Sequence, residues 1–325
     1  MEASIARRLT SVSVGQEQDE QGLVFVPIVG PSHEEPAYRL LEDEVLDAVK
    51  VTEVDEEGSV SELRIQNTLD VHVFLMDGQE LVGAKQNRIL NTDVLVPAKT
   101  TLIIPVSCIE QGRWGYTQKS FSPSGQSASN RIRAAKAKRV HDSLKTRGRH
   151  DADQSAVWSE CAAELQASAA CSPTAALNDA YEKRSRDLKG VRQRLSLPDN
   201  AVGLAMFRGG RFKGLDLFDR HSTLKYFWES LVDSYALTWL EVREPEVAAS
   251  ESRTIGQVIE NAADGKWERF DVPGDGQDYR LEDPAMSGSG LVWEDQVVVH
   301  LQLFPLDNEK QSPNRPRLHR RYARR

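Results

Sequence analysis

A close succession of short β-prone runs between residues 51 and 110 is the feature that most constrains the fold of this 325-residue chain. The runs are rich in Val, Ile and Leu, and turn signals such as Asp77-Gly78 and the prolines Pro97 and Pro105 separate them. Asp-Gly favours a tight hairpin, and proline borders a strand. A parallel α/β sheet would instead alternate strands with helices. We therefore expect a β-rich sandwich or partly open barrel.

The rest of the chain adds helices, so the fold class that we expect is α+β. Helix formers dominate three segments of a helical middle section, at residues 129–145, 154–170 and 173–195. Apolar residues also recur at helical spacing in Leu224–Leu240 and in Tyr38–Lys50, which predicts two amphipathic helices.

Composition shifts give the expected domain organisation. Residues 1–21 are polar and are expected to be a mobile N-terminus, and residues 307–325 a disordered basic tail. We expect one α+β domain between them. It spans residues 22–306 and comprises a β-rich part (22–118), a helical part (128–195) and an α+β part (200–306).

Bulk properties indicate a cytoplasmic protein without a membrane segment. No apolar run approaches the roughly 18 residues of a membrane helix, and the N-terminus lacks a signal-peptide pattern. Three scattered cysteines do not form a disulfide framework. The net charge is −8, although six arginines and no acid lie in the last fourteen residues, Ser312–Arg325. Arg315–Arg325 is thus expected to make at most a weak polyanion contact.

Several long stretches of the sequence resemble one protein family. They are DGQELVGAKQNRILNTDVLVPAKTTLIIPVSCIEQGRWGY (residues 77–116), VGLAMFRGGRFKGLDLFDRHSTLKYFWESLVDSYALTWLE (residues 202–241) and VVVHLQLFP (residues 297–305). The chain is similar over residues 22–305 to the ARG-and-rhodanese-phosphatase-superfamily-associated protein domain. The resemblance implies a mostly prokaryotic, here bacterial, family of unassigned function, with an association to ADP-ribosylglycohydrolases and rhodanese/phosphatase proteins. Association does not give mechanism.

The polar run Lys85-Gln86-Asn87-Arg88 is the first element of the site that we predict. Arginine and lysine bind phosphate or carboxylate, and the two amides can both donate and accept hydrogen bonds. The alternative is an ordinary solvated hairpin loop. The run is not a phosphate loop, because Ala84 separates Gly83 from the lysine and no serine or threonine follows it.

Further side chains are expected to join this run. Arg113 and Trp114 follow a strand-like run and are predicted ligand-binding residues, together with Lys85–Arg88. Glu80 and Glu110 are the predicted catalytic residues, because a desolvated carboxyl group can act as a general acid or base. The alternative is that either carboxylate only forms a structural ion pair.

Other reactive side chains suggest no further site. Cys108 stands five residues before Arg113, as in a cysteine phosphatase loop, but Glu110 between them would oppose a thiolate, so a buried inert thiol is expected. The seven histidines are dispersed, and we expect no metal and no cofactor. The basic run Arg131–Arg149 is either a helix that neutralises the acidic body or a phosphate-binding stripe.

Three functions remain open from the sequence. The favoured one is a ligand-binding or scaffold protein in a nucleotide- or ADP-ribose-linked pathway, which recognises an anionic small molecule through the polar loop. The second is a hydrolase of a phosphorylated or ADP-ribosylated substrate, with a glutamate as acid or base. The third is an oligomeric structural protein without a small-molecule ligand, and homo-oligomer formation is also compatible with the first.

Overall fold

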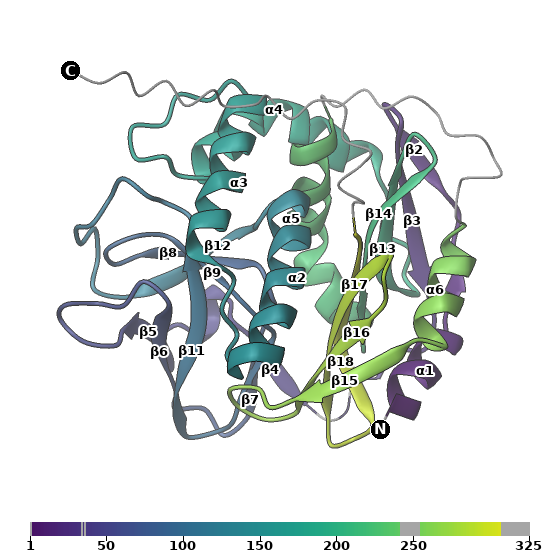
Figure 1. Ribbon diagram of the computed structural model, residues 1–325, viewed down its shortest axis with the longest axis horizontal. Helices are drawn as coiled ribbons and strands as arrows, with labels where there is room; N and C mark the ends of the chain where they lie inside the picture. The colour runs from purple at the N-terminus through teal and green to yellow at the C-terminus, as the bar shows by residue number, and fades with distance from the viewer. Residues whose placement is uncertain (1, 34, 36, 241–253, 307–325) are drawn as a thin grey trace.

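The β-prone runs close into a six-stranded antiparallel barrel (Figure 1). The computed structural model describes residues 2–33, 35, 37–240 and 254–306. Around the barrel, the strands follow the order β11 (Thr100–Cys108), β6 (Glu62–Asn67), β5 (Val49–Glu53), β12 (Phe121–Ser127), β8 (Gln79–Gly83) and β9 (Arg88–Leu90). The expected β-rich α+β class is confirmed. The barrel is closed rather than partly open, because the end of β11 pairs with β9 and leaves no free edge.

A three-stranded sheet extends the barrel and corrects one prediction. Its strands are β10 (Val94–Val96), β7 (His72–Leu75) and β4 (Tyr38–Leu40), and β4 runs parallel to β7. The helix predicted for residues 38–50 is therefore wrong: after β4 the chain forms only the short 3-10 helix η1 (Asp43–Val45) before β5. Leu41 and Val45 suggested a helix by their spacing, but they pack into the apolar cluster of the barrel.

A nine-stranded antiparallel sheet forms the other half of the molecule. Its strands follow the order β1 (Ser13–Val14), β3 (Leu23–Val29), β13 (Ala201–Arg208), β14 (Arg211–Phe218), β18 (Val297–Pro305), β17 (Met286–Trp293), β16 (Gln277–Glu282) and β15 (Lys266–Phe270), and β2 (Gln18–Glu20) pairs with β3.

Two helices cover the outer face of this sheet (Figure 1). They are α1 (Glu2–Thr10) and α6 (Ile255–Ala263), which contact each other and share one apolar cluster with the sheet. We expected a mobile segment over residues 1–21, yet it contains α1, β1 and β2. Its polar composition conceals Ile5 and Leu9, which lie four residues apart on one helix face and are fully buried.

Four helices lie on the side of the sheet that faces the barrel (Figure 1). They are α2 (Asn130–Arg147), α3 (Gln154–Ala167), α4 (Asn178–Arg194) and α5 (His221–Trp239). Helix α5 contacts barrel strand β12 as well as β13 and β14 of the large sheet. Its residues Phe227, Leu231 and Tyr235 are almost completely buried, so this stripe forms part of the core rather than a surface for self-association.

The basic run Arg131–Arg149, which covers most of α2 and the two residues after it, neutralises acidic groups elsewhere in the protein. Lys145 pairs with Glu268 and Glu282 of the large sheet, whereas Arg149 pairs with Glu62 of the barrel. Arg131, Arg133, Lys136 and Arg147 of the same run also pair with carboxylates, so six of its eight lysines and arginines have an acidic partner.

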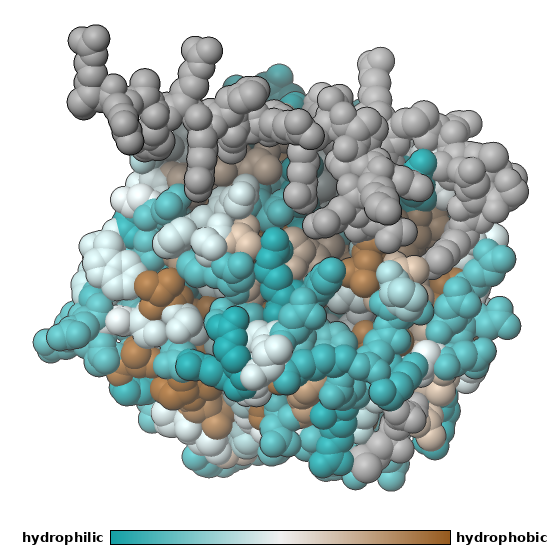
Figure 2. Space-filling view, in the orientation of Figure 1, coloured by the Kyte–Doolittle hydropathy of each residue, from teal (hydrophilic) through white to brown (hydrophobic). Residues whose placement is uncertain are grey.

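The surface offers little apolar area on the side shown in Figure 2, where hydrophilic side chains dominate and small separate apolar areas lie mainly over the barrel. In the described part of the chain, no helix is both long enough and apolar enough to span a membrane. The predicted basic tail, with Arg315–Arg325, lies outside the described residues.

Candidate functional site

The polar run of residues 85–88 lies at one mouth of the barrel. Residues 85–87 belong to the turn between β8 and β9, and Arg88 is the first residue of β9. Backbone geometry fixes this turn: Gly83 has φ 135° and Ala84 has φ 35°. A Cβ atom at Gly83 would lie 2.4 Å from the carbonyl oxygen of Ser120, so only glycine fits here. The space that glycine leaves at position 83 is therefore filled by the backbone of Ser120.

Lys85 closes the barrel mouth. It is only 7% exposed, and its Nζ donates to the carbonyl oxygens of Glu56 and Glu57. The same ammonium lies over the rings of Trp114 and Tyr116, at 5.3 and 5.2 Å from the ring centroids. Both rings are about half exposed, at 50% and 53%. Lys85 thus fixes a pair of aromatic rings at the surface through cation–π contacts.

Arg88 points into the end of the barrel, beneath Lys85 and Trp114, and is completely buried. Its Nη1 donates to Gln86 Oε1 at 3.1 Å, and its Nη2 lies 4.0 Å from Glu53 Oε1. Two polar atoms of this group, Arg88 Nε and Glu53 Oε2, are buried without a hydrogen-bond partner. Burial lowers the pKa of Arg88, partly offset by the nearby Cys108 and Glu53.

Cys108 is a buried thiol, as expected. It is fully buried and its Sγ donates to Gln86 Oε1 at 2.9 Å. Burial raises the pKa of the thiol above its usual range, although Arg88 opposes this effect. A protonated thiol is a poor nucleophile. Arg113 pairs with Glu110 instead of facing the sulfur, which leaves no cysteine phosphatase arrangement at these residues.

Glu110 is held as a carboxylate by three donors. Arg113 Nη2 lies 2.6 Å from its Oε2, the Asn87 N–H donates to the same oxygen, and Thr174 Oγ1 donates to Oε1. Burial would raise the pKa of Glu110, but the hydrogen bonds from Arg113 and Asn87 and the charge of Arg113 hold it below its usual range. Arg113 also donates to Asn87 Oδ1, so one ion pair locks the two loops together.

Glu80 stands apart from the other predicted residues. Strand alternation turns it away from the barrel interior that Leu81 faces. Its Oε2 accepts a hydrogen bond from Ser124, and its buried Oε1 has no partner. Burial raises the pKa of Glu80 to about 7; Ser124 opposes the rise and the charge of Glu110 adds to it. The two predicted catalytic carboxyl groups therefore differ: the pKa of Glu80 lies near neutrality, whereas the pKa of Glu110 is lowered.

The structure thus brings together Lys85, Gln86, Asn87, Arg88, Glu110, Arg113 and Trp114. Sequence reasoning missed three contributors, Glu53, Tyr116 and Thr174. No local spacing links them to residues 85–88, because barrel closure and the loop before α4 bring them into contact.

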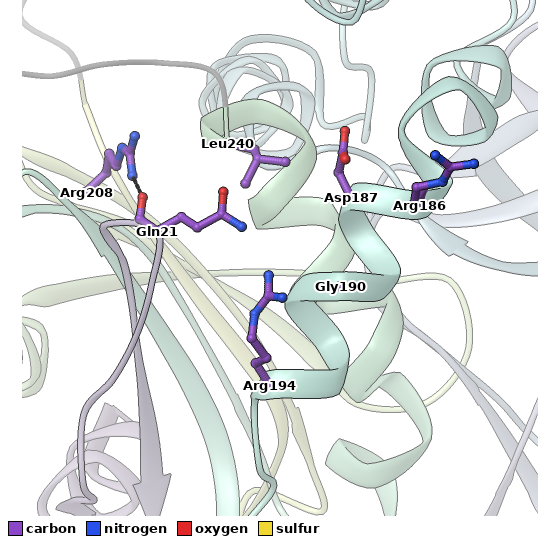
Figure 3. A pocket seen from close by; sticks show the side chains of 7 residues that line it. All are labelled: Gln21, Arg186, Asp187, Gly190, Arg194, Arg208 and Leu240. Atoms are coloured by element: carbon purple, nitrogen blue, oxygen red, sulfur yellow. Dashed lines mark hydrogen bonds between the residues drawn. The ribbon is translucent and has the colours of Figure 1, made fainter.

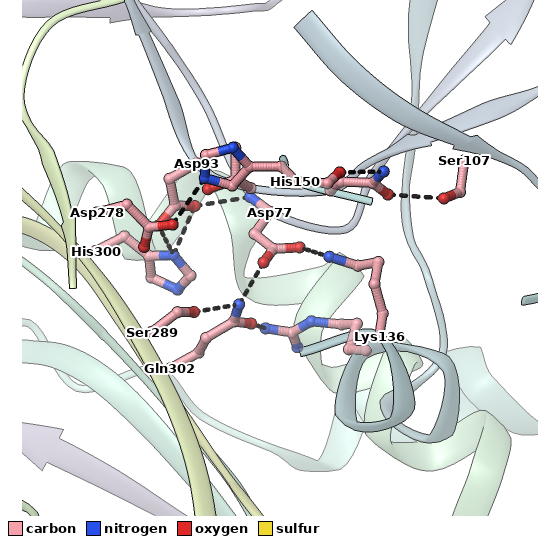
Figure 4. Close-up of polar contacts among 12 residues, drawn as sticks. Asp77, Asp93, Ser107, Lys136, His150, Asp278, Ser289, His300 and Gln302 are labelled. Carbon is pink, nitrogen blue, oxygen red and sulfur yellow. Dashed lines mark hydrogen bonds and ion pairs between the residues drawn. The ribbon is translucent and has the colours of Figure 1, made fainter. Parts of the chain in front are cut away.

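A second cluster, which the sequence did not indicate, lies between the barrel and the large sheet (Figure 4). Its charged members are all at most 5% exposed, and they are Asp77, Asp93, Arg133, Lys136, Asp216 and His300. We call them the buried network. Lys136 on α2 pairs with Asp77, which also accepts a hydrogen bond from Gln302. Figure 4 shows that Asp77, Asp93, Lys136 and His300 meet there from separate elements.

His300 is the bridge of the buried network. Its Nδ1 lies 2.9 Å from Asp93 Oδ1 and its Nε2 lies 3.2 Å from Asp216 Oδ1. Burial would lower the pKa of His300, but the charges and hydrogen bonds of Asp93 and Asp216 outweigh it and raise the pKa to about 9. A doubly protonated ring therefore ties a barrel connection to two sheet strands. Since every member is buried and paired, the arrangement joins the two halves of the protein.

A cavity of about 560 Å³ lies beside α4 (Figure 3). It is lined by Gln21, Arg186, Asp187, Gly190, Arg194, Arg208 and Leu240. Three arginines and one aspartate line it, although Arg194 also pairs with Glu20 at 2.6 Å and Arg208 donates to the Gln21 carbonyl. Sequence reasoning did not find this cavity, because the β2–β3 turn and α4 are far apart along the chain.

No group of three or more His, Cys, Asp or Glu side chains within the described ranges is arranged to hold a metal ion. Comparison with known proteins finds no match among curated proteins and none among solved structures. The sequence model of the ARG and Rhodanese-Phosphatase-superfamily-associated Protein domain matches residues 11–304, which includes the barrel, the helical section and the large sheet. The chain belongs to the ARG and Rhodanese-Phosphatase-superfamily-associated Protein domain family.

Proposed function

We propose that this protein is a ligand-binding or scaffold protein of a nucleotide- or ADP-ribose-linked pathway, and that it binds an anionic small molecule at the barrel mouth. One observation carries the proposal: Lys85, Arg88 and Arg113 lie in one cluster beneath two half-exposed aromatic rings. Cations beside an aromatic platform suit a ligand that has both a planar ring and a phosphate.

The aromatic pair supports recognition of a planar ring. Lys85 holds Trp114 and Tyr116 from the protein side, and Gly115 between them has no heavy atom within 4 Å of where a Cβ would stand. The open side of the rings is therefore accessible to a ligand. Base–aromatic stacking contributes roughly 1–3 kcal/mol per base.

The charged groups support recognition of an anion. Arg113 is the most accessible of the three cations, with 18% of its side chain exposed. Its partner Glu110 keeps it in place, while Lys85 and Arg88 below add positive charge in a region that is poorly solvated. An anion at the mouth would meet three cations against the two carboxylates of Glu53 and Glu110, and Arg113 would contact it directly.

Trp114→Ala tests this proposal. Loss of one stacking ring is expected to weaken the binding of ADP-ribose or AMP by about 10- to 100-fold, at roughly 1.4 kcal/mol per tenfold change. Calorimetric titration of the wild-type chain and the variant with ADP-ribose, NAD and AMP measures the change.

Ile103→Ala is the matched control, because Ile103 is an exposed apolar residue (43%) on β11 outside this cluster, and affinity should not change. The absence of binding to wild-type protein at millimolar ligand would overturn the proposal. If binding survives Trp114→Ala but is lost in Arg186→Ala/Arg194→Ala, the anion binds in the cavity beside α4 instead.

A second candidate function is a hydrolase that uses Glu80 as its acid or base. The observation that favours it is the pKa of Glu80 of about 7, since a general acid or base works best near the ambient pH. Glu110 would then act as the ionised partner that positions Arg113 at an anionic substrate.

Glu80→Gln separates catalysis from a structural role. A buried carboxyl group with a raised pKa destabilises the fold as pH rises from its unfolded value near 4.5 through about 7. At pH 8 the variant is therefore expected to be more stable than the wild type, by at most about 3 kcal/mol, with no difference at pH 4. Urea unfolding at both pH values measures this.

Activity in a screen of phosphorylated and ADP-ribosylated substrates is the second readout for this variant. A hydrolase should lose roughly 10²- to 10⁴-fold in rate in Glu80→Gln. If Glu80→Gln and Glu110→Gln both leave activity unchanged, the hydrolase candidate is wrong.

A further inference from the structure

A separate cavity of about 160 Å³ lies between α4, α5 and barrel strand β12. Its lining residues are Gln126, Asn178, Tyr181, Glu182, Ser185, Leu188, Arg192 and Asp233. None of them belongs to the barrel mouth cluster, to the buried network or to the cavity beside α4.

Two hydrogen-bond acceptors in this cavity have no donor. The side chain of Asp233 is 1% exposed; its Oδ2 pairs with Arg192, and its buried Oδ1 has no hydrogen-bond partner. Gln126 Oε1 is likewise buried without a partner. A buried acceptor without a donor costs roughly 1–3 kcal/mol. These oxygens therefore favour a ligand that donates hydrogen bonds.

The charge around the cavity favours a cation. Asp233 and Glu182 contribute two carboxylates against the single guanidinium of Arg192. Glu229 also lies near Arg192, at 3.5 Å, but its side chain is 74% exposed, so solvent screens its charge from the cavity. Burial raises the pKa of Asp233 to about 6. The charge of Arg192 and the nearby Gln126 amide oppose the rise, although that amide makes no hydrogen bond of normal geometry to Oδ1, so Asp233 is mostly ionised at neutral pH.

The size and floor of the cavity restrict the ligand further. Tyr181 and Leu188 are at most 3% exposed and give the cavity a partly apolar lining. The Tyr181 hydroxyl already donates to the carbonyl oxygen of Ser127, so it presents mainly its ring. At about 30 Å³ per water molecule, the volume equals roughly five waters. It therefore suits a group of a few non-hydrogen atoms.

We propose that this cavity binds a small primary ammonium compound, with its N–H groups donating to Asp233 Oδ1 and Gln126 Oε1 and its short alkyl chain against Tyr181 and Leu188. The site is independent of the proposed function at the barrel mouth. Charge attraction and two hydrogen bonds would supply the affinity, and the cavity volume would exclude longer or branched amines.

Titration of the full chain with n-butylammonium chloride, followed by NMR chemical shifts, tests the inference. Saturable binding is expected for n-butylammonium and not for n-butanol or butyrate, which have similar size but lack the ammonium. Asp233→Asn should weaken n-butylammonium binding at least tenfold. Glu229→Gln is the matched control, because it removes the same charge one turn earlier on α5 from a side chain that is 74% exposed, and affinity should stay within about twofold.

Gln126→Leu provides a second variant if Asp233→Asn does not fold, and it should weaken binding about fivefold or more by removing one acceptor. A cavity that holds water only would show no saturable shift with n-butylammonium. That result, or equal affinity for n-butylammonium and n-butanol, would overturn the inference, as would unchanged binding in the folded variants.

Discussion

Asp216→Asn is expected to lower the free energy of unfolding by about 3–5 kcal/mol, because it removes the carboxylate on which the buried network converges. Asp216 pairs with Arg133 through both oxygens and also accepts hydrogen bonds from Tyr235 and His300. Asparagine keeps the shape and one acceptor oxygen, but it leaves the charge of Arg133 buried without its carboxylate partner, beside Gln302, which accepts another of its hydrogen bonds. Equilibrium urea unfolding gives the change in free energy.

The pH dependence gives a second readout of the same network. The stability that His300 contributes is complete below its unfolded pKa near 6.5 and is lost as pH rises through about 9. The burial of Asp216 would raise its pKa, but Arg133 and His300 hold it well below its usual range, so its contribution is lost only in acid. In Asp216→Asn the NMR titration of His300 should shift to lower pH, because one of its two carboxylate partners is gone.

Two further variants control for non-specific effects. Asp70→Asn removes a carboxylate from the exposed Lys99–Asp70 pair and should cost less than about 1 kcal/mol. Tyr235→Phe removes only one donor to Asp216 and should cost about 1–2 kcal/mol, which is measurable even if Asp216→Asn does not fold. A loss in Asp216→Asn no larger than in Asp70→Asn would contradict the role assigned to the buried network.

Gly83→Ala is expected to lower the free energy of unfolding by about 2–4 kcal/mol, because a methyl group there meets fixed backbone in an unfavourable conformation. The φ of 135° disfavours any residue with a side chain, and the added Cβ would stand 2.4 Å from the Ser120 carbonyl oxygen. Since Gly83 begins the turn that carries Lys85–Arg88, the change should also displace the barrel mouth cluster. Thermal and urea unfolding measure the stability loss.

Gly115→Ala is the matched control for Gly83→Ala. It makes the same substitution near the barrel mouth, where no heavy atom lies within 4 Å of the added Cβ, so stability should stay within about 0.5 kcal/mol. Equal stabilities of the two variants would show that the Gly83 turn relaxes without cost, and the geometric argument would fail.

Local patterns predicted those parts of the fold that depend on nearby residues. Thr254 and Gln257, whose Thr-x-x-Gln spacing is typical of a capping box, form one at the start of α6, and the Gly209-Gly210 turn joins β13 and β14. The prediction failed where a strand partner far along the chain competed with a local preference. Tyr38–Leu40 pairs with β7, and this pairing overrides the helical spacing of the apolar residues that follow.

The sequence likewise indicated only part of the candidate site. The run from Lys85 to Arg88 was visible because four polar side chains stand between β-prone segments, and the resemblance to a family singled out the same stretch. The sequence did not indicate the ionisation states of the two glutamates in the predicted site. Glu80 and Glu110 are the same residue type, yet burial raises the pKa of the first to about 7, while Arg113 and Asn87 keep the pKa of the second low.

The sequence by itself determined the β-rich α+β class, the family and the stretch that carries the barrel mouth cluster, because these depend on periodicity, turn residues and recognisable strings. Only the tertiary structure decided that the barrel closes, that Asp77, Asp216 and His300 meet in one buried network, and that Asp233 faces a cavity with an unpartnered oxygen. The physical reason is that such contacts form between residues far apart in the chain. Their energies depend on burial and on the distance between charges, and no local pattern encodes either quantity.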